Sequence, residues 1–116
     1  MGKAEAFYQK FLASRQESVR LELALQGYFL DEEMPDAQRR AFEDYLRRRI
    51  RPAAEALMQR DALPMLQALE AQGWMDAALV EDCLAAAIRL RKAEAFLWLL
   101  GVKAEKYGFS DRVFDL

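Results

Sequence analysis

The sequence predicts an all-α protein, built as a short stack of antiparallel helical hairpins. Ala and Leu dominate its 116 residues, whereas the β-branched Val and Ile together occur only six times and Thr is absent. Apolar residues make up 53% of the chain, which is enough to form a core. A stretch in the C-terminal half also repeats after 31 positions, as stacked hairpins do. A compact helical bundle is the alternative.

The N-terminal part is expected to begin with two helices. Lys3–Ala13 carries its aromatic residues on one helical face, and a turn or kink is expected at Ser14–Ser18. Val19–Gln26 alternates apolar and polar side chains, which is the period of a strand. Nearly all of these residues favour a helix, however, and a lone strand is not stable. We therefore predict a second helix, ended by Gly27.

A third, amphipathic helix is predicted over Ala37–Arg51. It follows a loop over Phe29–Asp36, in which Asp36 is expected to be the N-cap. Its apolar stripe comprises Phe42, Tyr45, Leu46 and Ile50. Pro52 lacks the amide proton that a helix interior needs and should end or kink this helix near Arg51.

Two helical hairpins are predicted to follow, and turn residues mark their ends. The first pairs Pro52–Gln59 with Ala62–Gln72, and the second pairs Ala77–Leu90 with Lys92–Val102. Pro64 suits the first turn of a helix. The expected N-caps are Asp61 and Asp76, and the expected helix ends are Gly73 and Gly101.

The internal echo relates Ala53–Leu69 to Leu84–Leu100. At a displacement of 31, the identical pairs are Ala54/Ala85, Ala56/Ala87, Arg60/Arg91, Ala62/Ala93, Leu66/Leu97 and Leu69/Leu100. We therefore expect one domain, with N-terminal helices in residues 1–51, two hairpins in residues 52–102 and an apolar tail in residues 103–116. The tail is expected to fold back and cover the end of the stack.

The second hairpin resembles an ankyrin repeat. Ala85–Ile88 has the small, Ala-rich character of a first repeat helix, Arg89–Lys92 forms a short polar turn, and Phe96–Leu100 is Leu-rich like a second repeat helix. The T-P-L-H signature of that family is absent, and the period of 31 is shorter than the usual one. The resemblance implies protein binding through the concave face or the turn tips, and it assigns no particular binding residue.

The side chains of the sequence argue against catalysis and against a bound cofactor or metal. Histidine is absent, so the commonest general base and metal ligand is missing. Asp31, Glu32, Glu33 and Asp36 lack calcium-loop spacing and are interpreted as a solvated loop with a helix cap. Cys83 follows two acidic residues and is interpreted as a small core residue. We predict a protein without enzymatic activity.

An arginine cluster is the best candidate for a binding site. Residues 37–60 carry seven Lys or Arg against three Asp or Glu, although the whole chain has a net charge of −2. On a helical projection Arg40, Arg47 and Arg51 lie opposite the apolar stripe, with Arg48 beside them. Arg49 falls within the stripe. Planar guanidinium groups bind carboxylates and phosphates alike. A solvated face, with Arg39 and Arg49 extending along the apolar stripe to reach water, is the simpler interpretation.

The carboxylates of Glu43 and Asp44 are expected to form ion pairs with Arg47 and Arg48, one helical turn later.

Two partners are considered for these arginines. An acidic protein surface, including a second copy of this chain, ranks above a nucleic acid, because the flanking segments of the chain are acidic. Trp74 is a candidate apolar anchor, and Trp98 becomes a second one if it is exposed. We expect an adaptor or inhibitor that binds protein rather than membrane. With one cysteine and no signal-peptide pattern, the cytoplasm is the expected location.

Overall fold

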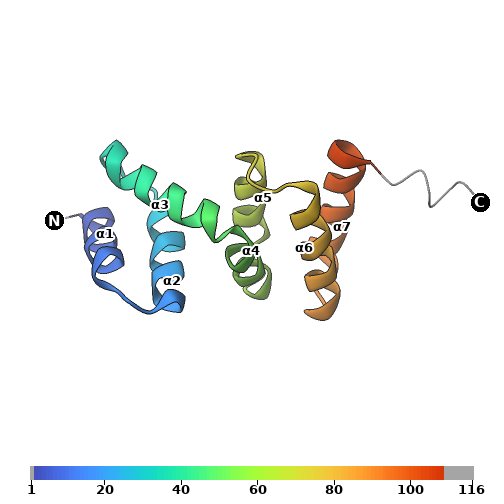
Figure 1. Cartoon of the computed structure of the whole chain (residues 1–116), viewed down its shortest axis with the longest axis horizontal. Coiled ribbons are helices and arrows are strands. Elements are labelled where there is room, and N and C mark those ends of the chain that lie inside the picture. Colours follow the sequence, from blue (N-terminus) through green and yellow to red (C-terminus); the bar gives the residue numbers. More distant parts are fainter. Residues whose placement is uncertain (1, 109–116) are drawn as a thin grey trace, which may run out of the picture. The chain divides into compact units, whose positions relative to one another are not determined.

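The computed structural model describes residues 2–108, and within that range every element is helical (Figure 1). The elements are α1 (Lys3–Ala13), α2 (Glu17–Tyr28), α3 (Asp36–Arg48), α4 (Ile50–Gln59), α5 (Leu63–Ala71), α6 (Ala77–Arg89), α7 (Ala93–Val102) and the π-helix η1 (Lys103–Tyr107). The predicted all-α fold class is therefore confirmed. The chain divides into two compact units, residues 1–53 and 54–116.

The first unit packs α1, α2 and α3 around an aromatic core. The ring of Phe42 on α3 meets Phe11 and Tyr8 of α1 edge-on, with centroid distances of 5.4 and 6.0 Å. Tyr45 contacts Phe11 in the same way at 5.1 Å. Leu12, which follows Phe11 on α1, is exposed. The predicted stripe of α3 is largely confirmed, since Phe42, Tyr45 and Leu46 are all buried.

The ambiguous stretch over 19–26 is part of helix α2, as predicted, but the helix does not end at Gly27. It continues to Tyr28, and Gly27 is buried against Phe42. A Cβ atom on Gly27 would lie 2.5 Å from Cζ of Phe42. This glycine therefore serves the close approach of two helices, and it does not supply the left-handed conformation of a C-cap.

The predicted helix over 37–51 is broken earlier than expected. α3 ends at Arg48, Arg49 has φ −115° and ψ 30°, and α4 starts at Ile50. Pro52 lies in the first turn of α4, where its missing amide proton has no helical acceptor to lose. Asp36 is the first residue of α3, and its side chain makes no capping hydrogen bond.

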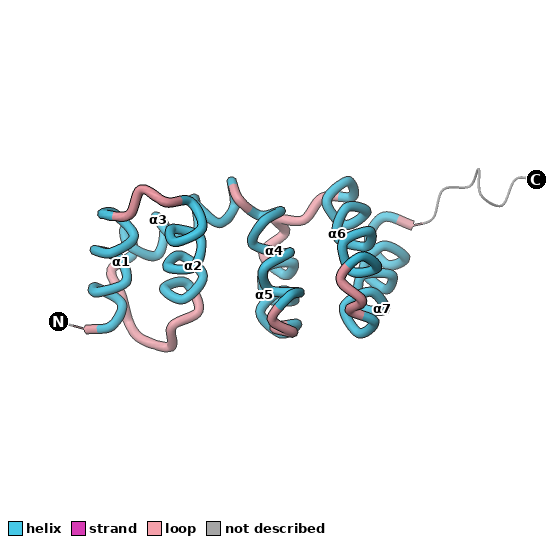
Figure 2. Tube along the Cα trace, turned by 90° about the horizontal axis from the view of Figure 1, so that it is seen from below, coloured by secondary structure: helices cyan, strands magenta, loops and turns pink. Residues whose placement is uncertain are grey.

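The second unit begins within α4, at Ala54, and contains the two predicted hairpins, the rest of α4 with α5 and α6 with α7 (Figure 2). Asp76 caps α6 by accepting a hydrogen bond from the amide of Leu79 at 2.8 Å, as predicted. Gly73, with φ 82°, ends α5 as predicted. The other two expectations are wrong: Gly101 lies inside α7, and Asp61 has φ 56° in the turn that ends α4.

The backbone of the second unit repeats after 30 residues. Asp61 and Arg91 are the two non-glycine residues with positive φ among the described residues, at 56° and 59°. The amide of Ala62 donates to Leu57 O at 2.9 Å, and the amide of Lys92 donates to Ala87 O at 2.8 Å. Asp61 and Arg91 add bonds to Met58 O and Ile88 O, each at 3.1 Å. Each turn is a Schellman motif.

Burial follows the same displacement of 30 and not the sequence echo of 31. Leu69 and Leu99, which are 30 apart, are both fully buried. The echo instead pairs buried Leu66 with Leu97, which is 67% exposed. Ala and Leu are so frequent in these helices that a wrong register still yields several identities. The backbone turns, which the sequence marks only weakly, identify the structural repeat.

The helix continues beyond α7 as η1, and side chains of η1 contact other parts of the second unit. The hydroxyl of Tyr107 in η1 donates to Met75 O at 2.5 Å, and Lys103 pairs with Glu81 at 2.5 Å. Lys106 pairs with Glu70 of α5. The start of the predicted capping tail therefore contacts α5, α6 and the loop between them. Phe109, Val113 and Phe114, the other apolar tail residues, lie outside the described residues.

Candidate protein-interaction site

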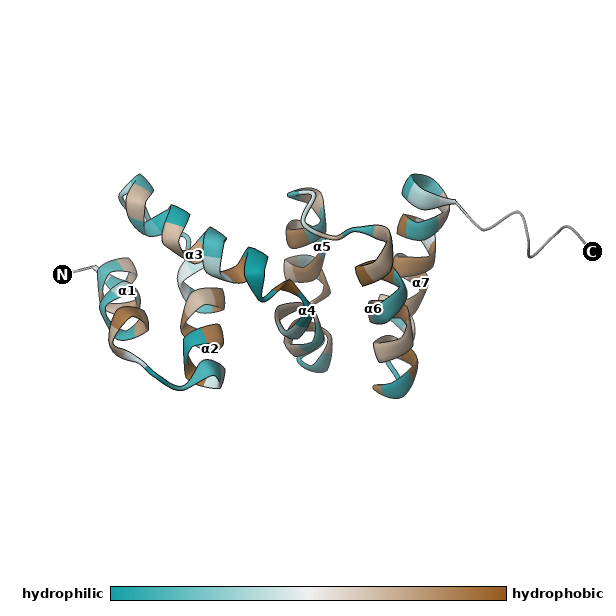
Figure 3. Ribbon diagram, viewed as in Figure 1, coloured by the Kyte–Doolittle hydropathy of each residue, from teal (hydrophilic) through white to brown (hydrophobic). Residues whose placement is uncertain are grey.

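The predicted arginine cluster is on the surface of the first unit. Arg40, Arg47, Arg48 and Arg51 are all exposed. Arg40 and Arg47 are seven residues apart on α3 and therefore share a helix face. Figure 3 shows hydrophilic residues recurring along the whole length of α3, between apolar ones. Arg51 lies on α4, beyond the break at Arg49, so the predicted single stripe is divided between two helices.

Ion pairs along α3 were expected from Glu43 to Arg47 and from Asp44 to Arg48. Within residues 2–108, neither Glu43 with Arg47 nor Asp44 with Arg48 comes within ion-pairing distance. The side chains of Arg40, Arg47 and Arg48 make no hydrogen bond to the described part of the chain. Their positive charges are therefore uncompensated by direct contacts, and Arg47 and Arg48 lie in the last turn, where the helix dipole favours cations.

Trp74 is not shown to join the arginines. It lies in the second unit, between α5 and α6, and its side chain is half-buried. Trp98 on α7 is half-buried as well. The site described below is accordingly confined to the first unit.

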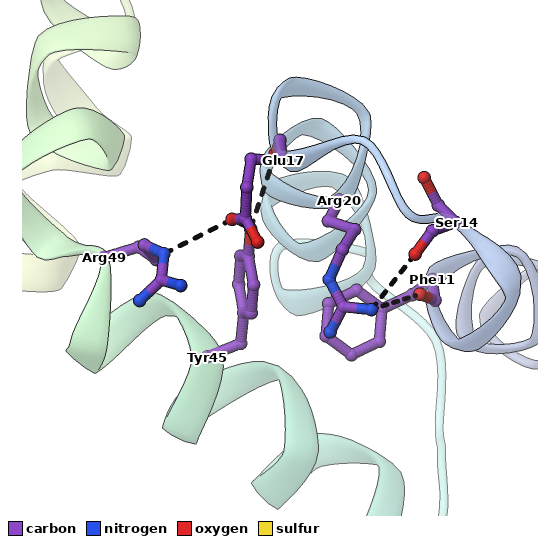
Figure 4. A network of polar contacts seen from close by, with 6 residues as sticks. All are labelled: Phe11, Ser14, Glu17, Arg20, Tyr45 and Arg49. Carbon is purple, nitrogen blue, oxygen red and sulfur yellow. Dashed lines mark hydrogen bonds and ion pairs between the residues drawn. The ribbon is translucent and has the colours of Figure 1, made fainter.

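A polar network joins α2 to the C-terminal end of α3, where Arg47 and Arg48 precede its member Arg49 in the sequence (Figure 4). The hydroxyl of Tyr45 donates to Glu17 Oε2 at 2.8 Å, and Arg49 Nε approaches the same oxygen at 3.3 Å. The guanidinium of Arg49 also lies 5.6 Å from the centre of the Tyr45 ring. The carboxylate of Glu17 thus holds the end of α3 against the start of α2.

Arg20 supports this network from the other side of the ring. Its guanidinium lies over Phe11 at 4.5 Å and over Tyr45 at 5.2 Å, both within cation–π range. It also donates to Phe11 O and Ser14 O, at 3.3 and 3.1 Å. These carbonyls belong to the C-terminal end of α1, so one side chain caps α1 and packs on α3.

The network changes the acidity of its members. The hydrogen bond from Tyr45, helped by Arg49 and Arg20, lowers the pKa of Glu17, while partial desolvation opposes the change. Burial, followed by the hydrogen bond to Glu17, raises the pKa of Tyr45. Near neutral pH, Glu17 is therefore an ionised acceptor and Tyr45 a neutral donor.

An apolar cavity of about 380 Å³ lies beside the network. Leu21, Tyr45 and Pro52 line it, together with Glu17, Ser18 and Arg49. Arg48 directly precedes Arg49 and Arg51 follows it by two residues, so these two arginines lie close to the cavity along the chain, whereas Arg40 lies in the N-terminal half of α3. An apolar hollow beside exposed guanidinium groups suits the insertion of an apolar side chain from an acidic partner.

Sequence reasoning missed Glu17 and Arg20, because their partners are up to 32 positions away and no spacing rule links them. It did place Arg49 within the apolar stripe, which was the available signal that this arginine would lie against the ring of Tyr45. The acidic loop has a structural role: Glu32 accepts a hydrogen bond from the amide of Ala4 at 3.3 Å, in the first turn of α1.

The described residues show no grouping of three or more acidic, cysteine or histidine side chains that could hold a metal ion. The Cys83 thiol is buried in α6, which agrees with its interpretation as a core residue. Along residues 2–108, no helix combines the length and the apolar character needed to cross a bilayer. Comparison with known proteins finds no family model, no curated protein and no solved structure that matches this chain.

Proposed function

We propose that this chain is a non-catalytic protein–protein interaction module, an adaptor or inhibitor that binds an acidic protein surface through α3. The observation that carries the proposal is the set of Arg40, Arg47 and Arg48, exposed and without a partner among the described residues. Arg51 and the cavity beside Arg49 extend this surface. Arginine is enriched at protein interfaces because its planar group forms paired hydrogen bonds with carboxylates.

The two helical hairpins of the second unit support the same class of function. Ankyrin-like hairpin stacks bind proteins, and the proposal takes over that general property without a residue assignment. A chain without histidine, with its cysteine buried, offers few groups for acid–base or nucleophilic chemistry. Its one cysteine also fits a reducing compartment such as the cytoplasm.

The test uses the full chain and two immobilised probes, a poly-glutamate peptide and a DNA duplex. The Arg40→Gln/Arg47→Gln/Arg48→Gln variant should lose poly-glutamate binding by about tenfold or more, since each lost charged contact contributes on the order of 1 kcal/mol. The matched Arg→Lys variant keeps the charge and should lose less, because a lysine cannot form the paired contact.

The DNA duplex tests the alternative partner, a nucleic acid. Tight duplex binding, with an affinity that falls steeply as salt rises, would favour phosphate recognition over the proposed acidic protein. Equal poly-glutamate binding by the native chain and the glutamine variant would contradict the proposal. Circular dichroism of each variant checks that α3 remains folded.

A further inference from the structure

A cavity of about 230 Å³ lies between the two helical hairpins of the second unit. The first hairpin lines it with residues of α4, α5 and the turn between them. The second lines it with the turn before α7 and with the first residues of α7. An apolar cavity of roughly 150 Å³ is enough to hold benzene, so this space is sufficient for a small organic molecule.

The cavity has an apolar floor and a charged mouth. Met58 and Leu66 of the first hairpin and Ala95 of α7 contribute buried side chains to its floor. The charged members of its lining are Asp61, Arg91, Lys92 and Glu94. All of these except Lys92 are exposed. An apolar interior with a few convergent polar groups is typical of a small-molecule site.

Two of the four charged side chains are paired with each other, and two are not paired. Lys92 Nζ lies 3.0 Å from the carboxylate of Asp61, so these two charges compensate each other. The side chains of Arg91 and Glu94 form no hydrogen bond or ion pair with the described residues. They carry opposite charges and are three positions apart at the start of α7. Within residues 2–108, the cavity therefore offers one uncompensated cation and one uncompensated anion.

The backbone at the mouth adopts a conformation that is rare for residues with a side chain. Asp61 and Arg91 are the two described non-glycine residues with positive φ, and both line this cavity. Glycine would adopt the same conformation without strain, and strained residues are concentrated at ligand sites. The Asp61 side chain has a partner in Lys92. A bound anion would give Arg91 the partner that Asp61 already has.

We infer that this cavity binds a free α-amino acid with an apolar side chain, such as leucine. The charges of the lining sum to zero, so a zwitterion is attracted through both of its groups, whereas a ligand with one charge meets attraction and repulsion together. The ligand carboxylate pairs with the planar group of Arg91, and its ammonium group pairs with Glu94. Its side chain lies against Met58 and Leu66.

This site belongs to the second unit and uses none of the arginines of α3. Its test therefore does not depend on the function proposed above.

The test titrates the full chain with L-leucine and follows the backbone amides by NMR. Amides of residues 61–63 and 91–95 should shift, with a Kd of about 1 mM or tighter. Two analogues of similar shape each lack one charge: 4-methylpentanoate has no ammonium group, and 3-methylbutylamine has no carboxylate. Each should bind at least about tenfold more weakly, because it leaves either Glu94 or Arg91 without a partner.

Two variants connect each charge of the ligand to one side chain. Arg91→Gln should weaken L-leucine binding by about tenfold without weakening 3-methylbutylamine, which has no carboxylate. Glu94→Gln should weaken L-leucine binding by about tenfold without weakening 4-methylpentanoate, which has no ammonium group. Both side chains are exposed, so neither variant should change the helix content measured by circular dichroism.

The Arg40→Gln/Arg47→Gln/Arg48→Gln variant serves as the control and should bind L-leucine as the native chain does. Its behaviour separates failure of this inference from failure of the function proposed for α3.

Three results would overturn the inference. Amide shifts that do not move at about 10 mM L-leucine would identify the cavity as a packing gap between the hairpins. An analogue that binds as tightly as L-leucine would show that the charge it lacks is not recognised. L-leucine binding that both Arg91→Gln and Glu94→Gln leave unchanged would place the ligand elsewhere on the chain.

Discussion

The ring of Phe42 occupies the space that a side chain at position 27 would need. An ideal Cβ on Gly27 would lie 2.5, 2.7 and 3.0 Å from three ring atoms, closer than carbon atoms pack. Phe42 is fully buried and itself contacts Phe11 and Tyr8. The ring therefore cannot yield without disturbing α1, and the fold of the first unit depends on the absence of a side chain on α2.

The first prediction follows from this contact. Gly27→Ala should lower the free energy of unfolding by about 1–3 kcal/mol, since overpacking outweighs the gain in helix propensity. Urea denaturation provides the measurement. Gly101→Ala is the matched control, because Gly101 also lies inside a helix but a Cβ atom added there would meet nothing within 4 Å. It should stabilise the protein by up to about 1 kcal/mol. Destabilisation of similar size by both variants would refute the packing role.

The second prediction concerns Tyr45 and Glu17. Tyr45→Phe removes the hydroxyl that chiefly lowers the pKa of Glu17, so that pKa should rise toward its ordinary value near 4.5. A lowered carboxyl pKa stabilises the fold above the unfolded-state pKa, and this contribution is lost as the pH falls through the folded-state pKa. The variant should therefore be less stable at neutral pH and closer to the native chain in acid.

NMR titration of the Glu17 carboxyl carbon tests the shift directly, and urea unfolding at neutral and acidic pH tests the linkage. Tyr8→Phe is the control, since the hydroxyl of Tyr8 has no partner in the described part of the chain. A Glu17 pKa that is the same in the native chain and in Tyr45→Phe would show that the hydroxyl does not hold the carboxylate.

The third prediction compares two positions that the repeat makes equivalent. Met58→Ala should destabilise the chain by about 2–5 kcal/mol, because it leaves a cavity between the hairpins. Ile88→Ala should change stability by less than about 0.5 kcal/mol, because the side chain is mostly solvated. Thermal and urea unfolding measure both. A large loss of stability for Ile88→Ala would contradict the exposure of this side chain.

The fourth prediction concerns the left-handed turn residue Arg91. A residue with a Cβ atom is strained by about 1 kcal/mol at positive φ, whereas glycine is not. Arg91→Gly should therefore stabilise the fold by about that amount. Asp61→Gly relieves the same strain, but it also removes the ion pair between Asp61 and Lys92. Unchanged or lower stability would show that the turn is not strained.

The amino-acid pattern predicted the helices well because each carries its own local signals. Asp76 and Gly73 mark helix ends by side-chain capping and by positive φ, and both were identified correctly. Gly27 was misassigned because a glycine that ends a helix and a glycine that admits a neighbouring ring look alike in sequence. The helix break was predicted near Arg51 but lies at Arg49 for a related reason. Pro52 indicates that a new helix begins nearby, but it does not determine the first residue of that helix.

The candidate site was only partly accessible to sequence reasoning. The exposure of Arg40 and Arg47 follows from helical periodicity, which is a local property. The contact of Glu17 with Tyr45 and Arg49 joins residues about 30 positions apart and depends on how α2 packs on α3. The wrong displacement of 31 has the same origin, since residue identity was compared where backbone conformation was the informative quantity.

The matching turns at Asp61 and Arg91 make the two helix junctions of the second unit interchangeable. A recombination event that joined Asp61 directly to Lys92 would remove residues 62–91, a length equal to one hairpin. Each remaining residue of the turn would keep the backbone conformation that it already has. Insertion of the same 62–91 segment would lengthen the array by the same rule. Duplication or deletion of this segment would therefore add or remove the length of one hairpin without creating a new turn. Each added copy would carry another arginine with positive φ in its turn.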